Sequence, residues 1–107
     1  GAPTQVTRAA GMALTKVIAG DGAPYNVLCN ALLVGKIATE QVARRHKRNA
    51  PDMPVEEYLA IEGKPVPLGR MGTAEEYANI ACFLASDHGS YITGTALNVD
   101  GNLSPVV

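Results

Sequence analysis

The stretch from Pro67 to Gly101 most constrains how this chain folds, because it contains a helix start, a helix and a strand in close succession. Thr73 followed by Glu76 is the pattern of a capping box, in which the hydroxyl and the carboxylate each bond a backbone amide at a helix N-terminus. Apolar residues then recur at helical spacing: Tyr77, Ile80, Ala81 and Leu84, with Phe83 beside them. The segment 87–90 ends this helix, and 94–99 has the length and composition of a buried strand.

The residues before this stretch predict a second helix and strand. Residues 7–19 place small and apolar side chains in one stripe, which predicts a helix. Glycines and a proline at 20–24 are expected to end it. Residues 26–33 are a short apolar run whose length and flanks favour a buried strand over a buried helix.

Two short helices are expected between the strands. Thr39 stands where an N-cap would precede a helix over 40–48, and the basic residues at 44–48 suit the C-terminal end of its dipole. A further helix is predicted over 55–62. The order helix–strand–two short helices–helix–strand indicates an α/β fold with adjacent parallel strands.

The predicted sheet is small, since 107 residues supply one domain and only two strands. Parallel strands normally have neighbours on their edges and layers on both faces. We therefore expect an open strand edge at about 26–32, covered by an N-terminal half outside this sequence or by another copy of the chain. The chain itself is expected to be a single partial domain over 1–107.

Composition limits the partners. With 47% hydrophobic and 18% charged residues the chain is expected to fold, and a net charge of −1 provides no attraction to nucleic acid or an anionic membrane. Cys29 and Cys82 lack metal-ligand spacing and are expected to be buried free thiols in a reducing cytoplasm. We expect a cytoplasmic protein without a metal site, a signal peptide or a membrane span.

Three segments of this chain resemble the short-chain dehydrogenase/reductase family. The family's last helix and strand are similar to PLGRMGTAEE and the following ASD and VDG of this chain. The family's catalytic helix is similar to RAAGMALTK at 8–16. Its "N.v.PG.i.T" turn is similar to NALLVGKIAT at 30–39. The resemblance spans almost the whole chain but only the C-terminal half of a typical member. It implies the C-terminal part of a Rossmann-like, doubly wound parallel sheet, in which 38–66 is a mobile lid over the substrate.

The resemblance also indicates which family functions are altered. Thr4 and Arg8 occupy the positions of the catalytic Tyr and Lys, so we assign no catalytic residue: a threonine hydroxyl titrates too high to exchange a proton, and arginine does not lose one. The glycine-rich pyrophosphate turn is absent, because the glycines at 20–22 follow a helix rather than a strand.

One part of the family's coenzyme site is retained. By resemblance, Gly35, Ile37 and Thr39 would contact the nicotinamide carboxamide of NAD or NADP, although Val34 replaces the usual proline. Thr39 is alternatively only an N-cap, and Ile37 only a core residue. The basic run 44–48 would fit an acidic substrate or, more simply, a solvated helix end, and Arg70 is expected to be a structural ion-pair partner.

The implied function is the C-terminal portion of an oxidoreductase that reduces carbonyls or oxidises alcohols of a small-molecule substrate with NAD(P). We expect the isolated chain to be inactive and to bind no coenzyme. The alternative is a non-catalytic, stand-alone homo-oligomeric assembly or binding module derived from that family. Relatives use the equivalents of the first helix, the helix from Thr73 and the last strand for subunit contacts, and the apolar tail at 105–107 would suit that role.

Overall fold

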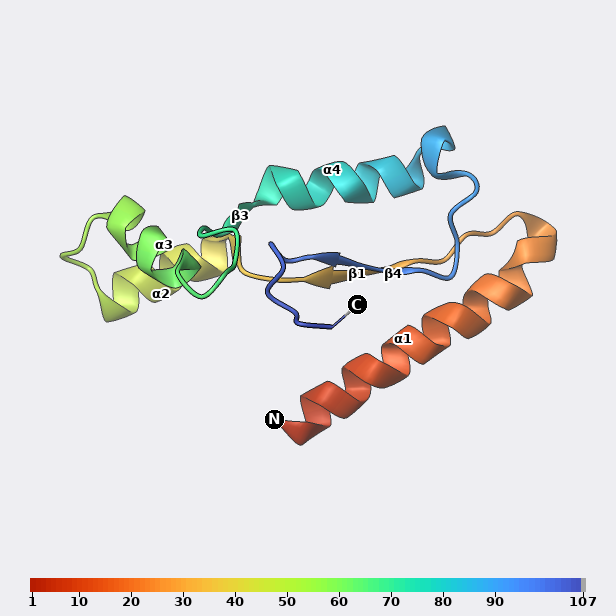
Figure 1. The fold of residues 1–107 in the computed structure, drawn as a ribbon, viewed down its shortest axis with the longest axis horizontal. Coiled ribbons are helices and arrows are strands. Elements are labelled where there is room, and N and C mark those ends of the chain that lie inside the picture. Colours follow the sequence, from red (N-terminus) through yellow and green to blue (C-terminus); the bar gives the residue numbers. More distant parts are fainter. Residues whose placement is uncertain (107) are drawn as a thin grey trace. The chain divides into compact units, whose positions relative to one another are not determined.

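The structure is a computed structural model that describes residues 1–106 (Figure 1). It confirms the predicted α/β order and adds one short pair of strands. The elements are α1 (Ala2–Gly22), η1 (Ala23–Tyr25), β1 (Ala31–Val34), β2 (Ile37–Ala38), α2 (Glu40–Asn49), α3 (Val55–Gly63), β3 (Gly72–Thr73), α4 (Ala74–Ala85), η2 (Asp87–Gly89) and β4 (Ala96–Val99).

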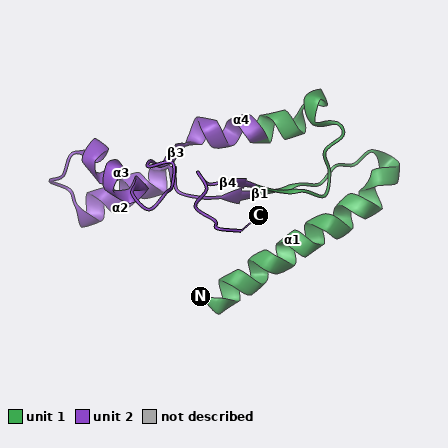
Figure 2. Cartoon of the chain, in the orientation of Figure 1, with its two compact units in different colours: residues 1–32, 81–97 green, residues 33–80, 98–107 purple. Residues whose placement is uncertain are grey.

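The chain divides into two compact units (Figure 2). The first comprises residues 1–32 and 81–97, so it holds α1 and the end of α4. The second comprises residues 33–80 and the C-terminal residues from Asn98, so it holds α2, α3 and the β2–β3 pair. No helix within residues 1–106 has the length and apolar character needed to span a membrane.

β1 and β4 are neighbours in a two-stranded sheet. The Ala31 amide donates to the Thr95 carbonyl at 2.8 Å, and the Gly35 amide donates to the Val99 carbonyl at 3.1 Å. Because the partners advance in the same direction along both strands, the strands are parallel. The predicted parallel, adjacent pair is therefore confirmed, and in the described part of the chain each strand has one unpaired edge.

The strand predicted over 26–33 begins only at Ala31. Asn26 has a left-handed backbone with φ of 56°, which ends the 3-10 turn instead of extending the chain. Asn30 then replaces ladder bonds with side-chain bonds: its amide donates to the Ile92 carbonyl at 2.9 Å, and its oxygen accepts from the Thr95 amide at 3.1 Å. The pattern of apolar residues does not reveal these local bonds.

α1 is longer than the predicted helix over 7–19. Pro3 lies in its first turn, where a proline needs no amide partner, so the helix begins at Ala2. Gly20 and Gly22 belong to the last turn of α1 and do not end it. Only Ala19 of α1 is buried.

Burial is lower than predicted because a two-stranded sheet covers few side chains. Residues 96–98 of β4 are exposed although the strand was predicted to be buried, and Val99 is only half-buried. The prediction that both thiols are buried is also wrong, since Cys82 is exposed and Cys29 is half-buried. Both cysteines are free, as predicted. In the part of the chain that the structure describes, the buried apolar residues are Ala19, Val42, Tyr58, Val66 and Met71.

The second unit contains the one buried cluster among the described residues. Val42 of α2, Tyr58 of α3 and Met71 before β3 pack together and are 3%, 9% and 8% exposed. His46 Nε2 lies 2.6 Å from the Met53 carbonyl, and its ring lies 5.1 Å from that of Tyr58. These contacts hold α2 against α3 in a helical hairpin at the predicted positions.

Gly35 allows β1 to turn tightly past the end of β4. A Cβ atom added at Gly35 would lie 2.5 Å from Asp100 Cα, a backbone atom that cannot move by itself. This close approach is a packing requirement for glycine.

We predict that Gly35→Ala lowers the free energy of unfolding by about 1–3 kcal/mol, because the new methyl overlaps the Asp100 backbone. Gly11→Ala is the matched control: nothing lies within 4 Å of its added Cβ, and alanine favours a helix interior over glycine by roughly 0.5–1 kcal/mol. Urea denaturation followed by circular dichroism measures both changes. Equal stabilities of Gly35→Ala and the wild type would contradict the close packing.

Candidate functional site

The candidate site is the segment 34–39, which joins β1 to α2 and includes β2. β2 pairs in parallel with β3, with Ile37 opposite Gly72 and Ala38 opposite Thr73. The Gly72 amide donates to the Lys36 carbonyl at 2.9 Å. These bonds fix the backbone of a segment that would otherwise be an irregular loop.

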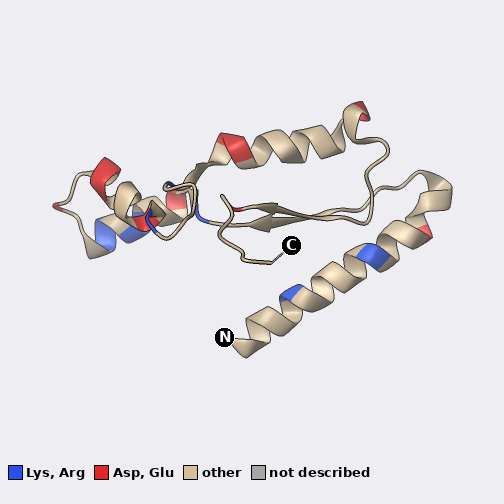
Figure 3. Ribbon diagram, viewed as in Figure 1, with Lys and Arg blue, Asp and Glu red and all other residues tan. Residues whose placement is uncertain are grey.

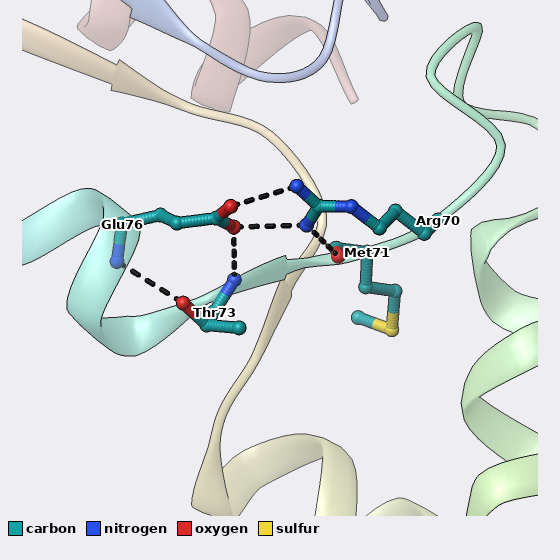
Figure 4. Close-up of polar contacts among 4 residues, drawn as sticks. All are labelled: Arg70, Met71, Thr73 and Glu76. Carbon is teal, nitrogen blue, oxygen red and sulfur yellow. Dashed lines mark hydrogen bonds and ion pairs between the residues drawn. The ribbon is translucent and has the colours of Figure 1, made fainter.

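An ion pair and a capping box anchor β3 at the start of α4 (Figure 4). Arg70 Nη1 and Nη2 donate to Glu76 Oε2 and Oε1 at 2.9 and 2.7 Å, a bidentate arrangement. Glu76 Oε2 also accepts from the Thr73 amide at 2.9 Å, and the Glu76 amide donates to Thr73 Oγ1 at 3.1 Å. The predicted capping box is therefore confirmed, and so is the ion-pair role of Arg70.

These bonds favour the charged form of Glu76. The Arg70 guanidinium, followed by the Thr73 amide, lowers the pKa of Glu76 to about 2. The same pair raises the pKa of Arg70. The carboxylate is therefore ionised at every pH at which the protein is expected to work.

Two of the cavities that border the segment 34–39 include Thr39 in their lining, and we name each after one lining residue. The Arg45 cavity, of about 220 Å³, includes Gly35, Lys36, Ile37, Thr39, Arg45 and Glu62 in its lining. The Tyr77 cavity, of about 320 Å³, is lined by Val34, Ile37, Thr39, Ala74 and Tyr77. The three predicted coenzyme residues thus share one cavity, and Ile37 and Thr39 line both.

Thr39 has the N-cap position of α2 without the side-chain bond of an N-cap. Its carbonyl accepts from the amides of Val42 and Ala43 at 3.0 and 3.1 Å, but its hydroxyl makes no capping bond. The residue is exposed to solvent. Its hydroxyl, which can both donate and accept, is thus available to a ligand in either cavity.

Thr4 and Arg8 lie on the first two turns of α1 in the other unit. They are one helical turn apart and both exposed. The glycines at 20–22 are helical and form no phosphate-binding turn. Within residues 1–106 no group of His, Cys, Asp or Glu side chains is arranged to hold a metal ion.

Two residues of the site were not singled out from the sequence. Lys36 Nζ pairs with Glu62 Oε2 at 3.3 Å and with the Glu62 carbonyl at 3.1 Å, which ties the segment to the end of α3. Arg45 was grouped with a solvated basic helix end, but it is half-buried in a cavity. Arg45 lies three residues after Val42 and therefore on the same face of the helix, which was the sequence signal that it would not be fully solvated.

A protein-family model described as enoyl-(acyl carrier protein) reductase matches residues 2–104 of this chain. Together with the α/β fold and the relatives described next, this match means that the chain belongs to the short-chain dehydrogenase/reductase family.

Relatives agree with this membership over most of the chain. The 3-oxoacyl-[acyl-carrier-protein] reductase FabG of Aquifex aeolicus is 38% identical over 97 residues, which are 91% of this chain and 36% of that protein. Dehydrogenase/reductase SDR family member 6 of Aquarana catesbeiana is 35% identical, over 92% of this chain and 39% of its own length. The chain therefore spans about two fifths of the length of these curated relatives.

A solved structure also matches the fold closely. The ligand-free short-chain oxidoreductase of Pseudomonas aeruginosa PAO1, described as containing an atypical catalytic center, superposes with a TM-score of 0.86 at 33% identity. The match covers 97% of this chain and 41% of that one. The Pseudomonas protein has also been solved with NADPH bound.

We predict that Glu76→Gln lowers the melting temperature at pH 7, because it removes the charge that Arg70 and the Thr73 amide bind. Since the folded pKa of Glu76 is about 2, below its ordinary value of 4.5, this stabilisation is fully present above about pH 4.5. It should decline as the pH falls through 2. Thermal melts from pH 2 to 7 check this.

The control for this measurement is Glu75→Gln, which removes a neighbouring exposed carboxylate outside the capping box. It should change the melting temperature little at pH 7. A wild-type advantage over Glu76→Gln that persists unchanged at pH 2 would contradict the assigned role of the carboxylate.

Proposed function

We propose that this chain is the C-terminal portion of an NAD(P)-dependent short-chain oxidoreductase, and that its segment 34–39 receives the nicotinamide end of the coenzyme. The observation that carries the proposal is the geometry of Thr39. Its hydroxyl is not used as a cap, and it borders a cavity together with Gly35 and Ile37. A carboxamide needs such a group, because it offers both donors and an acceptor.

The coenzyme fits only in part. The residues of segment 34–39 suit the nicotinamide end, whereas residues 1–106 contain no glycine-rich turn between a strand and a helix for the pyrophosphate. A bound coenzyme would supply the hydride for a carbonyl or accept one from an alcohol. This chain would orient the nicotinamide, and other residues would have to hold the phosphates.

The proton-transfer chemistry is altered in this proposal. Thr4 lacks the acidity of a phenol, and an arginine at position 8 does not supply the exchangeable proton of the family's lysine. A longer protein with these two residues would therefore reduce carbonyls slowly or obtain its proton elsewhere. The Pseudomonas relative with an atypical catalytic center supports the idea that this fold accommodates such departures.

We predict that the isolated chain binds neither NADH nor NADPH at micromolar concentrations, because residues 1–106 contain no phosphate-binding turn. Titration of coenzyme fluorescence measures this directly. Micromolar binding would contradict the claim that the chain supplies only the nicotinamide end.

The positive test restores the missing part. Residues 2–104 would replace the matching segment of Aquifex aeolicus FabG, and NADPH binding and carbonyl reduction would be measured. We expect NADPH binding that Thr39→Val weakens by about five- to tenfold through loss of one hydrogen bond, whereas Thr7→Val, on exposed α1, leaves it unchanged. Thr4→Tyr with Arg8→Lys should raise the rate of reduction. A folded chimera whose NADPH affinity is insensitive to Thr39→Val would refute the proposal.

A second candidate function, assembly into a homo-oligomer, is supported by the surface of α1. Val6, Leu14 and Val17 fall on one side of this helix and are 68%, 56% and 58% exposed. Several exposed apolar side chains on the same side of a helix commonly mark a protein–protein interface. We propose that a second copy of the chain covers this face.

We predict that the chain sediments as an oligomer and that Leu14→Glu with Val17→Glu shifts it to the monomer, because two charges would have to be buried in the interface. Gln5→Glu with Asn49→Glu adds the same charge at exposed polar positions and should leave assembly intact. Analytical ultracentrifugation distinguishes the states. A monomeric wild type would exclude this role for the isolated chain.

A further inference from the structure

The Arg45 cavity contains a positive charge that the described residues do not neutralise. Basic residues gather on α2, whereas α3 carries acidic residues (Figure 3). Most nearby charges are paired: Lys36 bonds Glu62, and Arg44 bonds Glu40. Arg45 has no ion-pair partner within residues 1–106.

The guanidinium of Arg45 is also short of a hydrogen bond. Its Nε is inaccessible to solvent and has no partner among residues 1–106. A buried donor without a partner is unfavourable, and more so when it belongs to a charged group. The N–H groups of arginine form a planar fork that matches the two oxygens of a carboxylate or phosphate.

Other residues of the cavity suit the same kind of ligand. Gln41 lies one helical turn before Arg45 and also lines the cavity, so its side-chain amide can donate a neutral hydrogen bond to the same ligand. The cavity also adjoins the N-terminus of α2, whose partial positive charge favours anions. The ion pair in the lining of the cavity, Lys36 with Glu62, is neutral overall.

We propose that Arg45 binds an anionic oxygen group, a carboxylate or a phosphate, on the substrate of this oxidoreductase. The role in substrate selection rests on the function proposed above, because Thr39 would hold the nicotinamide at the same cavity. A carbonyl or alcohol substrate bearing an acidic group would then be oriented by its charge, with its reacting carbon toward the coenzyme. Neutral substrates lack this contact.

The direct test is a titration of the 107-residue chain, labelled with ¹⁵N, in which the arginine side-chain Nε–H resonances are followed by NMR. Acetate represents a carboxylate source, inorganic phosphate a phosphate source, and acetamide is the neutral counterpart of acetate. We expect a saturable shift of the Arg45 resonance with acetate or with phosphate at constant ionic strength, and none with acetamide. The anion that binds more tightly identifies the acidic group.

Variants separate a specific site from general charge. Arg45→Gln should weaken anion binding about tenfold or more, and Arg45→Lys should weaken it less, because lysine keeps the charge but loses the fork. Arg44→Gln, on an exposed side chain that pairs with Glu40, is the matched control and should leave binding unchanged. Retained dispersion of the backbone amide spectrum establishes that each variant is folded, and Arg45→Lys serves if Arg45→Gln does not fold.

Two outcomes would overturn the proposal: equal, non-saturating shifts of Arg44, Arg45 and Arg48, which indicate charge screening, or no shift at all. The result is independent of the coenzyme experiment. If the chimera binds anions at Arg45 but does not bind NADPH, the proposed oxidoreductase function is wrong and only the anion site is supported. If the chimera binds NADPH but anions do not shift the Arg45 resonance, only the proposed anion site is wrong.

Discussion

The hydrogen-bonded cluster of Arg70, Thr73 and Glu76 is the interaction on which the candidate site depends. Glu76 satisfies the Thr73 amide, which α4 would otherwise leave without a partner, and its second oxygen binds the Arg70 guanidinium. The cluster thereby fixes β3, and β3 pairs with β2. The positions of Ile37 and Thr39 therefore follow from bonds made more than thirty residues later in the chain.

The proposed function separates binding from chemistry within one family fold. The segment 34–39 is proposed to receive the nicotinamide, and it has an uncommitted hydroxyl at Thr39. The described residues contain no glycine-rich turn between a strand and a helix, and in the proposed function Thr4 and Arg8 provide no proton relay. On this proposal the fold retains a ligand-binding surface although the residues of catalysis have changed, because the surface depends on backbone pairing and the chemistry depends on single side chains.

The sequence predicts the features that arise from local bonds. The capping box of Thr73 and Glu76 and the helices over 40–48 and 55–62 required only neighbouring residues, and the structure confirms them. The sequence does not predict β2 and β3, because strands of two residues show no periodicity and their pairing partners are distant in the chain. The family resemblance suggests Gly35, Ile37 and Thr39 as coenzyme contacts, and that assignment stays a prediction. The missing capping bond of Thr39 and the burial of Arg45 Nε could be seen only in the coordinates.

The Thr73–Glu76 cluster orders the segment 34–39 through the β2–β3 pair. Amide hydrogen exchange of Gly72 tests it most directly, because this amide donates to the Lys36 carbonyl across the pair at 2.9 Å. We expect the Gly72 amide to exchange slowly in the wild type and to lose its protection in Thr73→Ala, while amides within α1 keep theirs. Exchange of Gly72 at the rate of an unstructured peptide in the wild type, or unchanged protection in Thr73→Ala, would contradict it.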